Sequence, residues 1–74
     1  MQIRKISIGA DYKSNAMHYI VGQGVLGGSY SIHVITIDPD TGKLYVWIEK
    51  GDEVLLWKAF NAAIPVSIEY NINF

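Results

Sequence analysis

Residues 65–74 read Pro-Val-Ser-Ile-Glu-Tyr-Asn-Ile-Asn-Phe and alternate between apolar and polar side chains without a break. Successive side chains of a strand point to opposite faces, so a period of two is typical of a half-buried β-strand. The alternation therefore predicts a strand that runs to the last residue and belongs to a sheet. Its apolar face would hold Val66, Ile68, Tyr70, Ile72 and Phe74, and its polar face Ser67, Glu69, Asn71 and Asn73.

Turn signals divide the rest of the chain into short segments. The strongest is Asp38-Pro39-Asp40-Thr41-Gly42-Lys43, in which proline presets φ and Gly42 suits a left-handed position. Gly27-Gly28 predicts a two-residue hairpin turn, and Lys50-Gly51-Asp52 predicts another turn. The segments between these turns, 3–8, 17–26, 29–38 and 44–49, predict strands that precede the C-terminal one.

Three segments leave alternatives open. Residues 11–16 form a loop, or a helix start with Asp11 as the N-cap. Residues 17–26 form a strand, with a helix as the competing interpretation. Residues 53–58 form a short strand, or one helical turn that is capped by Asp52 and buries Leu55, Leu56, Ala59 and Phe60.

The sum is an all-β fold with at most one short helix. It is a small antiparallel meander that forms an open barrel or a sandwich in one β-rich domain, residues 1–74. Half of the residues are hydrophobic and only 18% are charged, although a domain this short buries only about 60% of its unfolded surface. Ile32, Val34, Ile35 and Ile37 place apolar groups on both faces of one strand. We therefore expect a homo-oligomer whose subunit interface completes the fold.

Composition limits the classes of function. The chain has no cysteine, which excludes disulfides and thiolate chemistry and fits a reducing cytoplasm. The net charge of −1 provides no basic surface for long nucleic acid. No apolar stretch approaches the roughly 20 residues of a membrane span, and the N-terminus does not resemble a signal peptide. We expect a cytoplasmic protein that binds neither long nucleic acid nor a membrane.

The best candidate site is a polar cluster near the N-terminus. It can contact phosphate through a cation, read a base edge through an amide and stack a base on a phenol. A solvated loop is the alternative interpretation. The candidate ligand-binding residues are Tyr12, Lys13, Asn15, His18 and Tyr19, with Arg4 and Lys58 as further phosphate partners.

Other chemistry finds little support in the sequence. His18 and His33 are the only imidazoles, and no further ligands stand at metal-site spacing. The glycines at 22, 24, 27 and 28 precede a predicted strand and not a helix, so bulges and turns explain them better than a phosphate loop. Trp47 and Trp57 are expected as core or interface anchors. We expect no catalytic residue, no metal and no cofactor, and hence no enzyme.

The stretch Ile6-Ser-Ile-Gly-Ala-Asp-Tyr-Lys-Ser-Asn-Ala-Met-His-Tyr-Ile-Val-Gly-Gln23 resembles the opening of small phage-encoded accessory proteins, among them the Thoeris anti-defence sponges. The resemblance implies an oligomeric β-rich protein that sequesters a cyclic nucleotide immune signal in the host cytoplasm without cleaving it. Those sponges have a β core followed by long C-terminal helices, whereas the alternation here predicts a strand up to Phe74.

Two functional hypotheses follow. The first is a non-catalytic binding protein that sequesters a small anionic, nucleotide-like ligand. The second is a protein–protein interaction module, such as an inhibitor of a host protein or a structural subunit, with Tyr45, Trp47, Trp57 and Phe60 as contact residues.

Overall fold

The computed structural model describes residues 2–9, 17–61 and 66–71, and in these residues the chain is all-β. The elements in chain order are β1 (Ile3–Ile8), β2 (Met17–Ile20), β3 (Gly24–Val25), the 3-10 turn η1 (Leu26–Gly28), β4 (Tyr30–Ile37), β5 (Leu44–Lys50), β6 (Glu53–Phe60) and β7 (Val66–Tyr70). No α-helix occurs in this part of the chain, so the predicted all-β class is confirmed.

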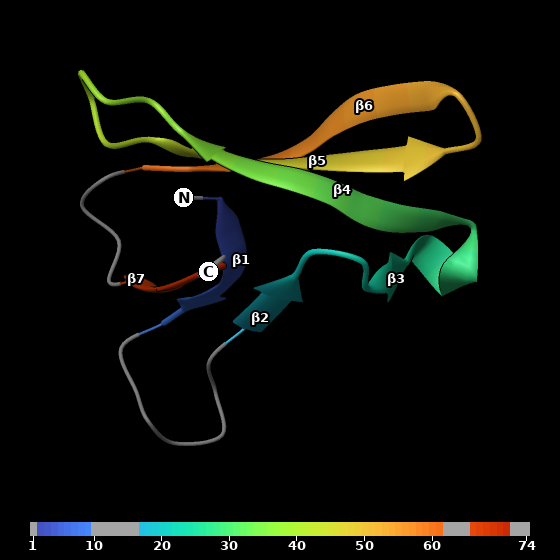
Figure 1. Ribbon diagram of the computed structural model, residues 1–74, viewed down its shortest axis with the longest axis horizontal. Coiled ribbons are helices and arrows are strands. Elements are labelled where there is room, and N and C mark those ends of the chain that lie inside the picture. The colour runs from blue at the N-terminus through green and yellow to red at the C-terminus, as the bar shows by residue number, and fades with distance from the viewer. Residues whose placement is uncertain (1, 10–16, 62–65, 72–74) are drawn as a thin grey trace.

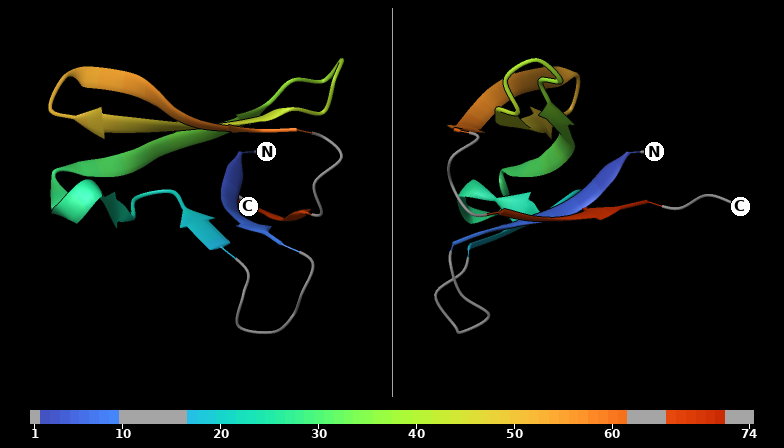
Figure 2. Two further views of the ribbon diagram at one scale, coloured as in Figure 1. Left: turned by 180° about the vertical axis from the view of Figure 1, so that it is seen from behind. Right: turned by 90° about the vertical axis from the view of Figure 1, so that its left-hand side faces the viewer.

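The strands form two antiparallel sheets that face each other. One sheet has the order β2-β1-β7, and the other has the order β3-β4-β5-β6. Figure 1 shows the four-stranded sheet curving over the smaller one, with β6 at its outer edge, and Figure 2 shows the same two layers from other sides. The larger sheet is a meander of consecutive hairpins, whereas β7 returns to pair with β1 near the start of the chain.

The C-terminal alternation is confirmed over β7. Val66, Ile68 and Tyr70 stand opposite Ile8, Ile6 and Ile3 of β1, so they share its inner face, and Ile68 is packed against the core. Ser67 and Glu69 lie on the outer face opposite Ser7 and Lys5. Asn71 continues the contact with β1, because its backbone N–H donates to Gln2 O at 2.7 Å. The predicted extension of the strand through residues 72–74 lies outside the described residues.

The turn at residues 38–43 is confirmed. The Gly42 N–H donates to Asp38 O at 2.7 Å, and the Asp38 N–H donates to Lys43 O at 2.9 Å. The Asp38 carboxylate accepts from the Asp40 N–H at 2.9 Å, which fixes the first half of the turn. Gly42 has a φ of 76°, a value that favours glycine. This turn sets the register between β4 and β5.

Residues 53–60 form strand β6, so the helical alternative is wrong. Gly51 and Asp52 make a two-residue turn, with Gly51 at a φ of 59°, and Lys50 then stands opposite Glu53. Positive φ at the first central position is typical of the tight turns that join antiparallel strands. Once the turn forms, β6 pairs with β5 along its whole length.

The expected single strand over residues 17–26 is wrong, because the segment divides into β2, a turn and β3. The chain turns at Val21 and Gly22, where Gly22 has a φ of 93°. This turn moves the chain from the smaller sheet to the larger one. The hairpin predicted at Gly27-Gly28 is present, but its loop spans Leu26 to Ser29 and is longer than the two residues expected.

Both sheets contribute to one hydrophobic core. β1 and β2 supply residues from the smaller sheet, and β4 and β5 supply residues from the larger one. Ile6, Ile32 and Val46 are the most completely buried side chains. The core consists of Ile3, Ile6, Tyr19, Ile32, Ile35, Leu44, Val46 and Ile48.

Three β-bulges change which side chains share a face. In β4, His33 is the extra residue between the pairs of Ile32 and Val34, so Ile32 and Ile35 both point into the core. Strict alternation would have placed these two residues on opposite faces. Val34 stands opposite Trp47 on the outer face, so the strand carries apolar groups on both faces as expected, with more of them on the inner face. Arg4 in β1 and Trp57 in β6 are the corresponding extra residues of the other two bulges.

We predict that Ile6→Ala destabilises the protein by about 2–5 kcal/mol, because it leaves a cavity between the sheets. Urea unfolding followed by tryptophan fluorescence measures the change. Met17→Ala is the matched control, since Met17 is an exposed apolar residue of β2, and it should change the stability by less than about 0.5 kcal/mol. Equal effects of the two substitutions would show that Ile6 is not central to the core.

We further predict that Leu26→Gly stabilises the protein. Leu26 is exposed and has a φ of 53°, and in the described residues it is the one non-glycine residue with positive φ. Left-handed backbone costs about 1–2 kcal/mol for an L residue, and the added freedom of glycine in the unfolded chain offsets part of the gain. Thermal unfolding should show a net gain of about 0.5 kcal/mol. Leu26→Ala keeps the strain and should give no gain.

Candidate functional site

The described members of the predicted ligand site lie in two separate places. Arg4 and His18 are exposed on the outer face of the three-stranded sheet. Tyr19 is buried between the sheets and is only 5% exposed, and Lys58 lies beside it on β6. Tyr12, Lys13 and Asn15 lie outside the described residues.

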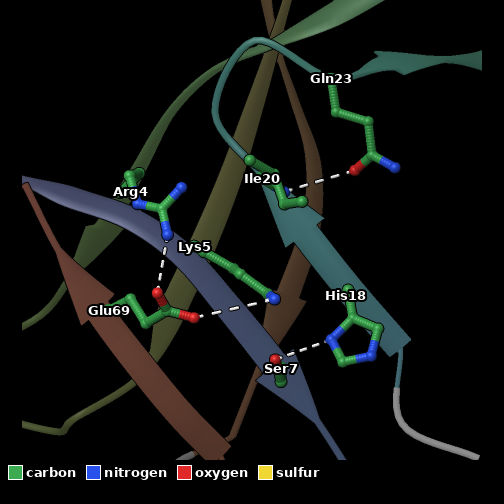
Figure 3. Close-up of polar contacts among 7 residues, drawn as sticks. All are labelled: Arg4, Lys5, Ser7, His18, Ile20, Gln23 and Glu69. Carbon is green, nitrogen blue, oxygen red and sulfur yellow. Dashed lines mark hydrogen bonds and ion pairs between the residues drawn. The ribbon is translucent and has the colours of Figure 1, made fainter. Parts of the chain in front are cut away.

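The outer face of the three-stranded sheet carries a row of polar side chains. We call Arg4, Lys5, Ser7, His18 and Glu69 the polar face, and Figure 3 shows that they come from three adjacent strands. The alternation of β1 creates it, because Ile6 and Ile8 point inward while Lys5 and Ser7 point outward. The bulge at Arg4 adds a second cation next to Lys5.

A charged network occupies one end of the polar face. The Arg4 guanidinium donates to Glu69 Oε1 at 2.7 Å, and Lys5 Nζ lies 3.7 Å from Glu69 Oε2. The hydrogen bond from Arg4, helped by the positive charges of Arg4 and Lys5, lowers the pKa of the Glu69 carboxyl below its ordinary value. Two cations and one ionised carboxylate leave a net positive charge on this face.

The other end of the polar face holds a hydroxyl–imidazole pair. Ser7 Oγ and His18 Nδ1 share a hydrogen bond at 2.8 Å, as their cross-strand register requires. Such a contact is also found between a nucleophile and its base. Here Ser7 lies on the central strand β1, which is paired with β2 on one side and β7 on the other, and His18 lies on β2. Because β1 is paired on both edges, the described residues around Ser7 provide no free pair of N–H donors for an oxyanion.

Tyr19 belongs to an aromatic cluster and is not a free stacking surface. Its ring meets Trp57 edge-on, with centroids 5.8 Å apart and planes at 77°, and lies 5.5 Å from Phe60. Lys58 Nζ is 5.0 Å from the Trp57 centroid and 5.8 Å from that of Tyr19. These contacts account for both Tyr19 and Lys58 through packing and cation–π attraction.

A shallow polar hollow of about 330 Å³ lies beside the glycine-rich segment. Glycines of this segment and Lys50 line it. Gly22, Gly28 and Gly51 of this lining have positive φ, so backbone conformation alone accounts for glycine there. The segment leads into strand β4 and not into a helix, as expected from the sequence. The hollow therefore lacks the helix N-terminus with which glycine-rich loops hold phosphate.

β6 forms a second exposed surface of opposite character. Val54, Leu55 and Leu56 are consecutive, and 46%, 42% and 49% of their respective surfaces are exposed. Trp47 of β5 stands opposite Leu56 on the outer side of the sheet and donates through Nε1 to Thr36 Oγ1 at 3.1 Å. Trp57 packs against the core, as predicted for an anchor.

Sequence reasoning missed Lys5, Ser7 and Glu69. The alternation of residues 65–74 places Glu69 on the polar side of the C-terminal strand, and Lys5 and Ser7 alternate with the apolar residues of β1. The alternation in each segment could have suggested a polar face on each strand. Neither pattern showed that β1 and β7 pair, which brings the two polar faces together.

Comparisons with protein-family models, with curated proteins and with solved structures gave no match. Among the described residues there is no group of three or more His, Cys, Asp or Glu side chains that could hold a metal ion. Nor does a helix in this part of the chain have the length and apolar character needed to cross a membrane. Functional inference therefore rests on the two surfaces described above.

We predict that Arg4→Ala raises the pKa of Glu69, because it removes the hydrogen bond that lowers this pKa most. NMR titration of the Glu69 side-chain carbon measures the change, and Lys5→Ala should raise the pKa less, since its contact is longer. A carboxyl with a lowered folded pKa stabilises the protein above its unfolded pKa, and this contribution is lost as the pH falls through the folded pKa. Wild type should therefore lose more stability on acidification than Arg4→Ala. Unchanged titration in Arg4→Ala would contradict the contact.

Proposed function

We propose that this protein is a non-catalytic binding protein that holds a small anionic ligand of nucleotide type on its polar face. The observation that carries the proposal is the gathering of Arg4, Lys5, Ser7 and His18 on one exposed face with a single carboxylate among them. A guanidinium, an ammonium, a hydroxyl and an imidazole are the groups with which proteins bind phosphate.

The donors of this face are only partly used. Arg4 directs one nitrogen at Glu69, and its guanidinium has further N–H groups. Lys5 Nζ lies 3.7 Å from Glu69 Oε2, which is longer than a hydrogen bond. The ion pair therefore does not hold the Lys5 side chain tightly. Both cations can therefore turn toward an incoming anion while the sheet keeps their backbones in place.

The shape of the face favours binding over catalysis. It is the surface of a sheet whose strands are paired on both sides at β1. A ligand on such a surface is held by charge and hydrogen bonds and remains open to water. The proposed mechanism is mass action, in which binding lowers the concentration of free ligand and forms no product. A cyclic nucleotide immune signal has the required charge, and a phage-encoded protein of this kind would act in the host cytoplasm.

Isothermal titration with ADP-ribose, a cyclic dinucleotide and a cyclic trinucleotide tests the proposal at low salt, where exposed charges are least screened. We expect Lys5→Ala and Arg4→Ala each to weaken binding roughly tenfold, the usual effect of losing a charged hydrogen bond. Lys43→Ala is the matched control, because Lys43 is a cation that lies over Tyr45 in the other sheet, and it should leave binding unchanged.

Glu69→Gln gives the sharpest outcome. Removing this carboxylate frees both cations, so an anion should bind more tightly and the dependence on salt should increase. Weaker binding in Glu69→Gln would show that the ligand is not held by charge. No heat with any of the three ligands would remove the proposal.

A further inference from the structure

The outer edge of β6 is free in the described part of the chain. β6 is the last strand of the order β3-β4-β5-β6, so only one of its two edges is paired. Natural edge strands are usually shortened or protected by proline, by charges, by a bulge or by a covering loop. β6 has eight residues and no proline. Its bulge at Trp57 follows Val54, Leu55 and Leu56, which stand together at the exposed end. Such an edge accepts a further strand.

We propose that this edge binds β6 of a second copy of the chain in an antiparallel arrangement centred on Leu55. The two four-stranded sheets then continue into one sheet across a two-fold axis. This inference goes beyond the ligand-binding function and does not depend on it.

The faces of β6 determine which pairings are possible. Val54 and Leu56 stand opposite Glu49 and Trp47 on the outer face, and Leu55 stands opposite the buried Ile48 on the inner face. A two-fold axis perpendicular to a sheet keeps each face on its own side, so only residues of the same face can meet. With Leu55 opposite its own copy, Val54 meets Leu56 on the outer face.

The bulge at Trp57 completes the match. Because Trp57 is an extra residue, Lys58 stands opposite Val46 and points to the inner face, as Glu53 does opposite Lys50. In the pairing centred on Leu55, Glu53 of each copy therefore stands opposite the bulged pair Trp57 and Lys58 of the other, within reach of the Lys58 ammonium. Cross-strand pairs lie about 5 Å apart, which lets opposite charges make contact. The edge is complementary to itself in both apolar character and charge.

Neighbouring registers lack this match. A centre at Leu56 brings Trp57 and Lys58 opposite Leu55, and a centre at Val54 brings Glu53 opposite Leu55 and Asp52 opposite Leu56. Each places a charge against an apolar side chain on at least one face. The charge pairing thus selects one register, and it favours a second copy over an unrelated strand.

The first test is the mass of wild-type protein by sedimentation equilibrium from about 1 µM to about 1 mM, the range in which weak dimers form. We expect twice the 8.3 kDa of one chain. Leu55→Lys places like charges on the axis and should weaken the dimer roughly a hundredfold. Met17→Lys is the control, because Met17 is also an exposed apolar residue but lies on β2, and it should leave the dimer intact.

The second test exchanges the charges. Glu53→Lys and Lys58→Glu each create repulsion and should weaken self-association about tenfold. An equimolar mixture of these two variants restores both pairs and should form a heterodimer as tightly as wild type. Since Glu53 accepts from Tyr30 and Lys58 lies over Trp57, circular dichroism of each variant must first show the native spectrum.

Three results would overturn the inference. They are a wild-type monomer across the whole concentration range, a dimer that survives Leu55→Lys, and a mixture that associates no better than its components. A monomer whose β6 edge is protected from hydrogen exchange only by a different protein would also overturn it, because the occupant would then not be a second copy. None of these results bears on ligand binding at the polar face.

Discussion

The packing of β1 against the larger sheet is the contact on which the rest of the structure depends. β1 is the central strand of the small sheet, and it lies against β4. Ile6 has no exposed surface and shares one core with Ile32 and Val46. Removing the apolar side of the small sheet from water is favourable, so its burial against the larger sheet helps to hold β2 and β7 in place. The same strand presents Lys5 and Ser7 to solvent, so the core contact also positions the polar face.

Bulges bring additional side chains of the strands to the side that faces this core. His33 and Trp57 are extra residues on either side of Trp47, one on each neighbouring strand of β5. Bulges increase local twist, and the sheet that contains both is the strongly curved one. Because Ile32 and Ile35 are brought to one side, the core receives two large residues from a segment that strict alternation would divide between faces. Arg4 is placed next to Lys5 by the same means in β1.

Much of the local structure could be predicted from the sequence, and the pairing of distant strands could not. Alternation identified β7, and proline and glycine identified the turns beside β5. Residues 53–60 remained ambiguous because an apolar run of this length suits a strand or a helical turn equally, and pairing with β5 decided between them. For the site, Arg4 and His18 were named, whereas Glu69 required the pairing of β1 with β7 across more than sixty residues. In a sequence, a bulge shows only as a break in the alternation of apolar and polar residues. The sequence therefore could not show that Arg4 lies on the outer face of the sheet and Tyr19 on the inner face.

The two exposed surfaces differ because they are built on strands with different neighbours. β1 is paired on both edges, so its backbone groups are satisfied and only its outward side chains can bind a partner. β6 is paired on one edge, so its backbone groups remain available along with its apolar side chains, and strand addition satisfies both at once. A polar ligand is therefore suited to the face of the small sheet, and a polypeptide strand is suited to the edge of the large one. Because the sheets are opposed across the core, the two partners would occupy separate parts of the surface, and a dimer through β6 would leave both polar faces exposed to ligand.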